Sequence, residues 1–216
     1  MIGASGGIGA ALVEALETRG AGVTRLSRAG DGLDLRDPAS VERAMGGVEG
    51  PFEAAWLATG ILAPPGRSPE KALAAIEAEA MAEVLQVNAV GPALVLRHMP
   101  RLLPRKGRSV LGVLSARVGS IGDNRLGGWH GYRASKAALN QLVRGTAIEL
   151  ARSHPEAVVA ALHPGTVATA FTAAYSPAHG TLAPMEAARR LLTVMDGLSP
   201  AETGRFWDHA GREVPW

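Results

Sequence analysis

The chain has 216 residues, 47% hydrophobic and 19% charged, with a net charge of +2 at pH 7. This predicts one globular domain over residues 1–216, and the scattered basic residues exclude the charge pattern of a nucleic-acid binder. With no cysteine, disulfides and thiolate metal sites are excluded, and the six dispersed histidines show no metal-ligand spacing. No apolar run reaches the ~20 residues of a membrane span and no signal peptide precedes the first glycines, so we expect a cytoplasmic protein without metal or membrane contact.

A glycine-rich segment, GASGGIG, opens the chain, with Gly3, Ser5, Gly7, Ile8 and Gly9 in it. Glycine allows a tight turn and close approach of the backbone to a ligand. The free N–H groups and the dipole of a helix that starts directly behind the loop suit a pyrophosphate. The same spacing also occurs in ordinary turns, so the later motifs have to decide between the two interpretations.

The elements that follow alternate between helix and strand. Apolar spacing and turn residues predict helices over 7–20, 37–45, 69–103 (broken once), 132–152 and 184–195. Short apolar runs predict strands over 22–27, 31–35, 51–60, 109–115, 157–164 and 204–207. This order indicates an α/β fold with a Rossmann-type, doubly wound parallel sheet and helices on both faces.

The strand expected before the glycine loop is truncated, because only Met1 and Ile2 precede Gly3. That strand is central in a doubly wound sheet, and a gap there leaves two strand edges unpaired. We therefore expect that roughly five further residues upstream complete the strand, and that a form without them binds its cofactor poorly.

The second predicted strand ends in Leu-Ser-Arg, which bears on the choice of cofactor. An acidic residue at this position prefers NAD, whereas a basic one accepts the 2′-phosphate of NADP. Ser27 stands where the acid would be and Arg28 follows, which favours NADP, with NAD the less favoured alternative. Arg28 could instead be a solvated turn residue. Asp34 and Leu35, at the end of the third predicted strand, could contact the adenine.

Tyr132 and Lys136 lie four residues apart at the start of a predicted helix, hence on one face of it. An adjacent ammonium stabilises a phenolate, so we expect Lys136 to lower the pKa of Tyr132 toward neutrality. Such pairs also arise by chance, and this one becomes specific only beside the glycine loop.

Taken together, the motifs resemble those of the short-chain dehydrogenase/reductases, which are NAD(P)-dependent oxidoreductases. The resemblance covers essentially the whole chain. The stretch LSARVGSIGDNRLGGWHGYRASKAALNQ and the terminal GREVPW resemble in particular the C-factor (C-signal) subgroup, which is related to carbonyl reductases. The motifs that carry the resemblance are the loop glycines Gly3, Gly7 and Gly9, Asn88 in VNAVGP, the pair Tyr132 and Lys136, and HPGTVAT at 163–169.

The resemblance implies a mechanism and a set of site residues. Tyr132 would exchange a proton with the substrate carbonyl oxygen while nicotinamide exchanges a hydride with its carbon. Lys136 would bind the nicotinamide ribose, and Asn88 would hold a water, bend its helix, or do both. The segment Pro164, Gly165, Val167 and Thr169 would hold the carboxamide and the phosphates.

Two departures from the family pattern lie within the site. The family's carbonyl-polarising serine falls on Ala116, so we assign its role to Ser115, with Ser120 as the other candidate. Loss of such a donor costs about 100- to 1,000-fold in rate. The usual Asn-Asn-Ala-Gly after the fourth strand reads LATG, in which Thr59 and Gly60 remain to pack the cofactor.

A short substrate lid is expected near 170–184, with Tyr175 in it. Trp129 and His130 either line the pocket or serve only as packing. A short lid predicts an open pocket that tolerates bulky carbonyls.

The alanine-rich faces of 72–103 and 134–150 indicate a homodimer or homotetramer, unless these small residues merely fit the helices to their own sheet. We expect an NADP(H)-dependent carbonyl reductase or alcohol dehydrogenase acting on a small-molecule substrate. The alternative is a non-catalytic NADP(H)-binding signalling or sensor protein, which Ala116 favours and the intact tyrosine–lysine pair disfavours.

Overall fold

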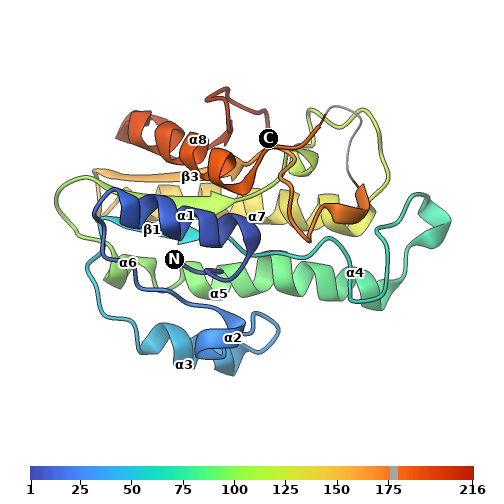
Figure 1. The fold of residues 1–216 in the computed structure, drawn as a ribbon, viewed down its shortest axis with the longest axis horizontal. Coiled ribbons are helices and arrows are strands. Elements are labelled where there is room, and N and C mark those ends of the chain that lie inside the picture. The colour runs from blue at the N-terminus through green and yellow to red at the C-terminus, as the bar shows by residue number, and fades with distance from the viewer. Residues whose placement is uncertain (176–179) are drawn as a thin grey trace.

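The computed structural model describes residues 1–175 and 180–216, which form a parallel sheet between two layers of helices (Figure 1). The strands pair in the order β1-β2-β3-β4, and every neighbouring pair is parallel. Their bounds are Ala54–Leu57 for β1, Ser109–Leu114 for β2, Ala157–His163 for β3 and Arg205–Asp208 for β4. The predicted α/β fold with a parallel sheet is confirmed.

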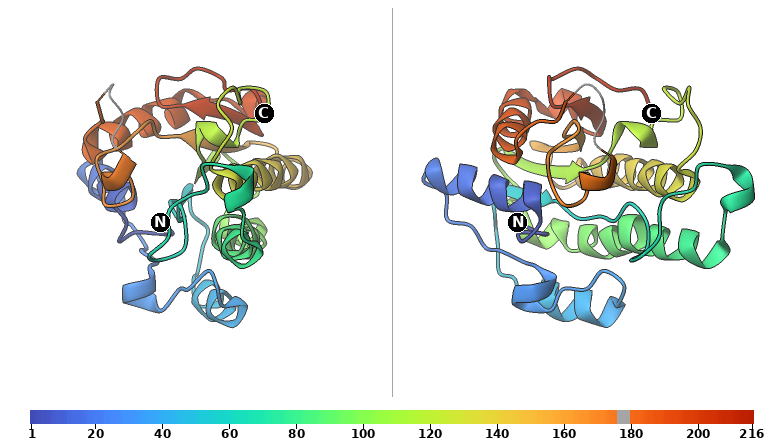
Figure 2. Two further views of the ribbon diagram at one scale, coloured as in Figure 1. Left: turned by 90° about the vertical axis from the view of Figure 1, so that its right-hand side faces the viewer. Right: turned by 45° about the vertical axis from the view of Figure 1, so that its right-hand side comes forward.

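Helices cover both faces of this sheet, as the end-on view in Figure 2 shows. α1 and α8 lie on one face, and α3, α5 and α7 on the other. The helices are α1 (Gly7–Thr18), α2 (Arg28–Asp31), α3 (Pro38–Gly46), α4 (Ala78–Leu85), α5 (Gly91–Leu96), α6 (Met99–Leu102), α7 (His130–Leu150) and α8 (Pro184–Gly197). The short turns are η1 (Leu73–Ala75), η2 (Gln86–Val90), η3 (Arg117–Gly119), η4 (Ala173–Tyr175) and η5 (Pro200–Glu202).

Two apolar cores, one on each face of the sheet, explain why the strands read as unbroken hydrophobic runs. Along β3, Val159 and Ala161 pack toward α5 and α7, whereas Val158 and Ala160 pack toward α1 and α8. Successive side chains of a strand point to opposite faces, so a sheet covered on both sides needs an apolar residue at every position.

The N-terminus lies at a strand position between β1 and Leu26. The N–H of Ile2 donates to the Trp56 carbonyl at 2.8 Å, and the Ala58 N–H donates to the Ile2 carbonyl at 2.8 Å. Isolated parallel bridges join Ile2 to Leu26 and to Leu57. Ile2 therefore makes a single bridge to each neighbour, which agrees with the truncated strand that the sequence predicted.

The predicted strands over 22–27 and 31–35 are wrong. Leu26 makes one bridge to Ile2, and the rest of 22–27 has no neighbouring strand in the described residues to complete a ladder. Residues 28–31 form α2, capped by the Ser27 side chain, and 33–35 are irregular. Local β propensity does not make a strand without a partner backbone.

The helical stretch predicted over 69–103, broken once, is wrong only in its start. α4 begins only at Ala78, and the π turn η2 separates it from α5. α5 ends at Leu96, and Arg97 and His98 separate it from α6, which is a single break of the kind predicted. In the described part of the chain no helix is long and apolar enough to cross a membrane.

Candidate active site

A cavity of about 1140 Å³ opens at the carboxyl ends of β1, β2 and β3. This is the edge of a doubly wound sheet at which ligands bind. Among the predicted site residues, the cavity is lined by Ser5, Gly7, Ile8, Arg28, Thr59, Gly60, Ser115, Tyr132, Lys136, Pro164, Gly165, Val167 and Thr169. Gly3, Gly9, Ser27, Asp34, Leu35 and Asn88 lie outside its lining.

The glycine loop is packed so tightly that side chains would not fit. A Cβ on Gly9 would lie 2.0 Å from the carbonyl oxygen of Gly3, and one on Gly7 would lie 2.5 Å from Thr169 Cγ2. Gly3 has φ +86°, a left-handed conformation, and its backbone contacts Ala58. No side chain caps the start of α1, so its first N–H groups are left for a ligand in the cavity.

The residues predicted to read the adenosine end divide into two groups. Arg28 is exposed and lines the cavity, whereas the Ser27 hydroxyl is used to cap α2 by accepting from the Gly30 N–H at 3.0 Å. Asp34 accepts from the Arg36 N–H, and the buried Leu35 packs against Gly91. Asp34 and Leu35 therefore support the loop before α3 and do not line the cavity.

Tyr132 and Lys136 lie side by side in the first turns of α7. Both are buried, and Lys136 Nζ lies 6.0 Å from the centroid of the phenol ring. The ammonium donates to the Leu114 carbonyl at 3.1 Å. Burial lowers the pKa of Lys136 to about 8 and raises that of Tyr132 above its usual value. The predicted lowering of the tyrosine pKa is therefore not found, because desolvation outweighs an ammonium that is directed to a carbonyl.

Asn88 joins the loop after β1 to α7. Its Oδ1 accepts from the Ile61 N–H at 2.8 Å, while its Nδ2 donates to the Ile61 carbonyl at 2.8 Å and to Ser135 Oγ at 2.9 Å. The side chain is fully buried within the π turn η2. Asn88 thus braces Ile61 against the helix that carries Tyr132, which fits the predicted helix-bend role.

The position of the missing serine shows how the site differs from the expected pattern. Ala116 lines the cavity, and the hydroxyl of the buried Ser115 donates to Asn140 Oδ1 at 2.6 Å. Ser120 lies outside the lining and accepts from the Asp123 N–H at 3.0 Å. In this structure neither serine directs a hydroxyl proton into the cavity, although Ser115 lies beside it.

Two threonines line the cavity beside the glycine loop. Thr59 Oγ1 is buried and has no partner among the described residues, which fits a hydrogen bond to a group bound in the cavity. Thr169 contacts the glycine loop, and its N–H donates to Thr172 Oγ1 at 3.3 Å. These two side chains and the open N–H groups of α1 form a cradle that fits a dinucleotide.

Four aromatic side chains form an aromatic wall in the cavity: Trp129, Tyr132, Phe171 and Tyr175. Trp129 packs edge-on against Tyr175 and Tyr132, with ring centroids 5.4 and 6.2 Å apart. Phe171 lies 6.0 Å from Tyr132. The wall uses both tyrosines of a chain in which aromatic residues make up only 4%. Trp129 is therefore part of the pocket, whereas His130 is not.

Sequence reasoning assigned no role to Phe171, Arg117 or His163, which also line the cavity, although His163 opens the HPGTVAT motif. His163 precedes the Pro-Gly pair, and burial, followed by the nearby His209 and Arg117, lowers its pKa to about 4, so it is neutral at pH 7. Phe171 follows the Thr169 motif directly, and its rarity in this chain was the one available signal.

The predicted lid near 170–184 is described only in part. Residues 170–175 lie beside the cavity, and Val167 pairs with Leu182 in a parallel bridge. Positions 176–179 lie outside the described residues. Within residues 1–175 and 180–216, no three His, Asp or Glu side chains gather closely enough to hold a metal ion.

Comparisons with known proteins agree with this geometry. A family model described as enoyl-(acyl carrier protein) reductase matches residues 3–197. The chain is 41% identical over 147 residues to C-signal of Myxococcus xanthus, which covers 67% of this chain and 84% of that protein. Other curated relatives match over little more than half of their own length.

Two solved structures are similar over the whole of this chain and 97% of their own. One, from Burkholderia multivorans, is described as a short-chain dehydrogenase/reductase with bound NADP, at 26% identity and a TM-score of 0.81. The other is a carbonyl reductase from Pseudomonas aeruginosa PAO1, at 27% identity and a TM-score of 0.78.

Proposed function

Because the chain belongs to the short-chain dehydrogenase/reductase family of oxidoreductases, we propose that it transfers hydride between NADP(H) and a carbonyl or alcohol substrate, with Tyr132 as the acid/base. The observation that carries the proposal is the buried pair of Tyr132 and Lys136 in one cavity with the open glycine loop. The relative with bound NADP supports the choice of cofactor.

The cradle formed by the glycine loop, Thr59 and Thr169 would hold the dinucleotide, which supplies the hydride when bound. Arg28 is the cation at the cavity rim that would pair with a 2′-phosphate, and it is exposed as such a role requires. NAD has no such charged group, so the same arginine gives it nothing comparable.

Tyr132 would donate its proton to the carbonyl oxygen during reduction. The burial that raises its pKa keeps the hydroxyl protonated, so it can act as an acid without a separate proton source at that atom. Lys136 would bind the nicotinamide ribose and become a closer cationic partner of the phenol. Asn88 would fix the loop at Ile61 and hold a water near Lys136.

Ser115 is proposed to assist by donating to the carbonyl oxygen after its hydroxyl leaves Asn140. Reaching the substrate requires that a 2.6 Å hydrogen bond be broken, so this help is weaker than that of a freely placed donor. We therefore expect slow turnover compared with an enzyme that has serine at position 116.

The substrate would be a neutral, bulky carbonyl compound. The aromatic wall offers flat apolar faces beside Tyr132. Among the described residues the lining contains no carboxylate and no lysine other than Lys136, so recognition of a strongly charged substrate would fall to Arg28 and Arg117.

The test is NADPH oxidation by the purified protein against aromatic aldehydes, diketones and quinones, with NADH in parallel. Turnover in the unsubstituted protein that is lost in Tyr132→Phe, with NADPH binding unchanged by fluorescence, supports the proposal. No turnover despite NADPH binding would support the second candidate, a non-catalytic signalling or sensor protein, which the methyl group of Ala116 at the polarising position favours.

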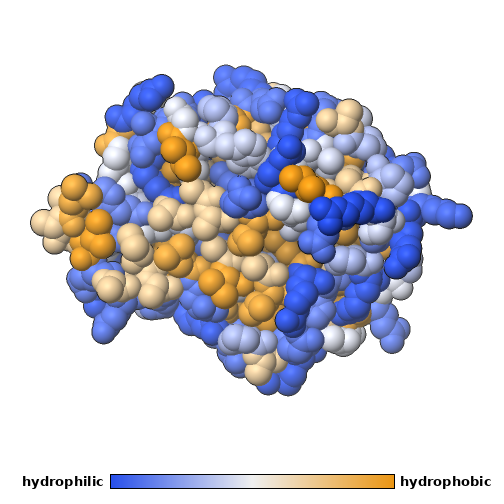
Figure 3. Space-filling view, turned by 180° about the vertical axis from the view of Figure 1, so that it is seen from behind, coloured by the Kyte–Doolittle hydropathy of each residue, from blue (hydrophilic) through white to orange (hydrophobic). Residues whose placement is uncertain are grey.

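We also propose a homodimer or homotetramer in the cytoplasm. Hydrophobic side chains gather on the face formed by α7 and α5, seen from behind in Figure 3. Ile148 on α7 and Val90 on the neighbouring turn η2 are 50% and 45% exposed. Sedimentation equilibrium tests this assembly, and a monomer at micromolar concentration would refute it.

A further inference from the structure

The turn that leads into α7 is strained and is held by a residue far away in the sequence. Trp129 has φ +50°, the single positive φ of a non-glycine residue in residues 1–175 and 180–216. A bulky residue in this left-handed region is strained and persists only when its surroundings hold it. Trp129 is also the N-cap of α7, and its side chain makes no capping hydrogen bond.

Glu70 accepts hydrogen bonds from two N–H groups of this turn. The Trp129 N–H donates to the Glu70 carbonyl oxygen, and the Gly131 N–H donates to Glu70 Oε2 at 3.2 Å. The second contact joins residues 61 positions apart in the sequence. A carboxylate at a helix start satisfies an otherwise free N–H and interacts favourably with the helix dipole.

The approach of Glu70 is close. A Cβ on Gly131 would lie 2.9 Å from Glu70 Oε1, so a larger residue there would displace the carboxylate. From the other side, the Arg133 guanidinium donates to the carbonyls of Gly127 and Gly128 at 3.1 and 2.9 Å. The turn is therefore held by Glu70 on its N–H groups and by Arg133 on its carbonyls.

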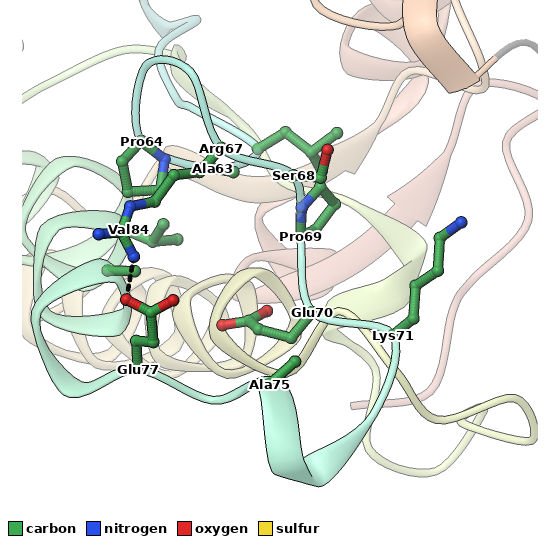
Figure 4. Close-up of a pocket in the computed structure, with 12 residues that line it drawn as sticks. Ala63, Pro64, Arg67, Ser68, Pro69, Glu70, Lys71, Ala75, Glu77 and Val84 are labelled. Carbon is green, nitrogen blue, oxygen red and sulfur yellow. Dashed lines mark hydrogen bonds and ion pairs between the residues drawn. The ribbon is translucent and has the colours of Figure 1, made fainter.

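Figure 4 shows Glu70 in its surroundings, a smaller pocket of about 290 Å³ between residues 62–71 and α4. Glu70 and Lys71 point in opposite directions, and Arg67 pairs with Glu77 across the pocket. Neither Lys71 nor Arg67 therefore pairs with the Glu70 carboxylate, which is available to α7.

We propose that Glu70 is a positioning residue, which clamps the Trp129 turn and thereby fixes the indole and Tyr132 relative to each other. Trp129 packs against Tyr132 at one end and Tyr175 at the other, so a change in its backbone moves the wall of the substrate site. The proposal rests on the proposed function for its kinetic consequence, but the clamp itself is a property of the protein alone.

The test compares Glu70→Ala, Glu70→Gln and, as a matched control from the same pocket, Glu77→Ala. Hydrogen–deuterium exchange measures the exchange rate of the Gly131 amide. NADPH oxidation measures kcat, the KM for the substrate and the affinity for NADPH. Loss of one cap hydrogen bond speeds exchange by about fivefold to tenfold. We expect this in Glu70→Ala, together with a fall in kcat of similar size and NADPH affinity changed less than twofold.

Glu70→Gln keeps an oxygen that accepts from Gly131, so it should restore both exchange and kcat to within about threefold of the unsubstituted protein. Glu77→Ala should change neither. If Glu70→Ala does not fold, Glu70→Asp replaces it, because its shorter side chain withdraws the carboxylate from Gly131.

Unchanged Gly131 exchange in Glu70→Ala would overturn the clamp, and unchanged kcat with faster exchange would overturn the positioning role. A glutamine variant as impaired as the alanine variant would also contradict it. Absence of NADPH oxidation in the unsubstituted protein would refute the proposed function, and the exchange data would still decide the clamp.

Discussion

Replacing Lys136 by methionine should stabilise the cofactor-free protein at pH 7. The lysine is 3% exposed, and burial lowers its pKa from 10.5 to about 8. Methionine keeps most of the length of the side chain without the charge. The substitution gives up one hydrogen bond, from Nζ to the Leu114 carbonyl.

The magnitude follows from the pKa change. A shift of one unit corresponds to about 1.4 kcal/mol, so the depressed pKa of Lys136 costs the folded state about 3 kcal/mol at pH 7. Loss of the hydrogen bond to Leu114 reduces this gain in stability by about 1 kcal/mol. Lys136→Met should therefore be about 2 kcal/mol more stable than the unsubstituted protein.

The effect depends on pH with a definite sign. Between pH 8 and pH 10.5 the lysine holds its proton in the unfolded chain but has lost it in the folded one. The unfolded state then binds more protons, so the stability contributed by this site rises with pH across that window. The advantage of the methionine variant should fall by about 2.5 kcal/mol between pH 7 and pH 10, so that it has disappeared at pH 10.

Urea unfolding of both proteins without cofactor, at pH 7 and pH 10, measures this difference. Comparing the two proteins at each pH removes the contribution of groups that they share. A methionine variant no more stable at pH 7, or an advantage that is the same at both pH values, would refute the reasoning.

Four further predictions concern the cofactor loop, its supports and helix α7. Arg28→Ala should weaken NADPH binding about ten- to hundredfold and NADH binding only slightly, as measured by fluorescence titration. Equal losses for the two cofactors would rule out a contact between Arg28 and the 2′-phosphate. Gly9→Ala should abolish NADPH binding, because the added Cβ would lie 2.0 Å from the Gly3 carbonyl oxygen. In Gly145→Ala, within α7, the added Cβ meets no neighbouring atom, so this variant should raise the free energy of unfolding by about 0.5–1 kcal/mol, as measured in urea. Asn88→Ala should lower the free energy of unfolding by about 2–4 kcal/mol, because the Ile61 N–H and carbonyl lose their hydrogen-bond partner. A loss below about 1 kcal/mol would contradict the bracing role of Asn88.

The parts of the fold that could be predicted from the sequence are those that local pattern decides. The apolar run at 109–114 and the spacing of Tyr132 and Lys136 specify β2 and the first turns of α7 without reference to distant residues. Asp37 followed by Pro38 likewise marks the start of α3, where the aspartate side chain caps the helix.

The misses have a common physical cause, since each depends on a distant segment. Residues 22–27 have strand propensity, but a strand requires a partner, and Ile2 supplies only one bridge. The hydroxyl of Ser115 is directed by Asn140, which is 25 residues away. Phe171 joins the aromatic wall only because the segment after β3 folds back over α7.

The π turn at Gln86–Val90 makes the number of residues between α4 and α5 part of the site. Each residue turns an α-helix by about 100°, so the extra residue in this turn sets the rotation of α5 relative to α4. Removing one residue anywhere in the turn would restore a regular helix and swing the Asn88 side chain away from Ile61. Substitutions on the outer surface of these helices leave that rotation intact. Insertions and deletions change the rotation even when they lie far from any ligand. This segment therefore tolerates changes in residue type far better than changes in length.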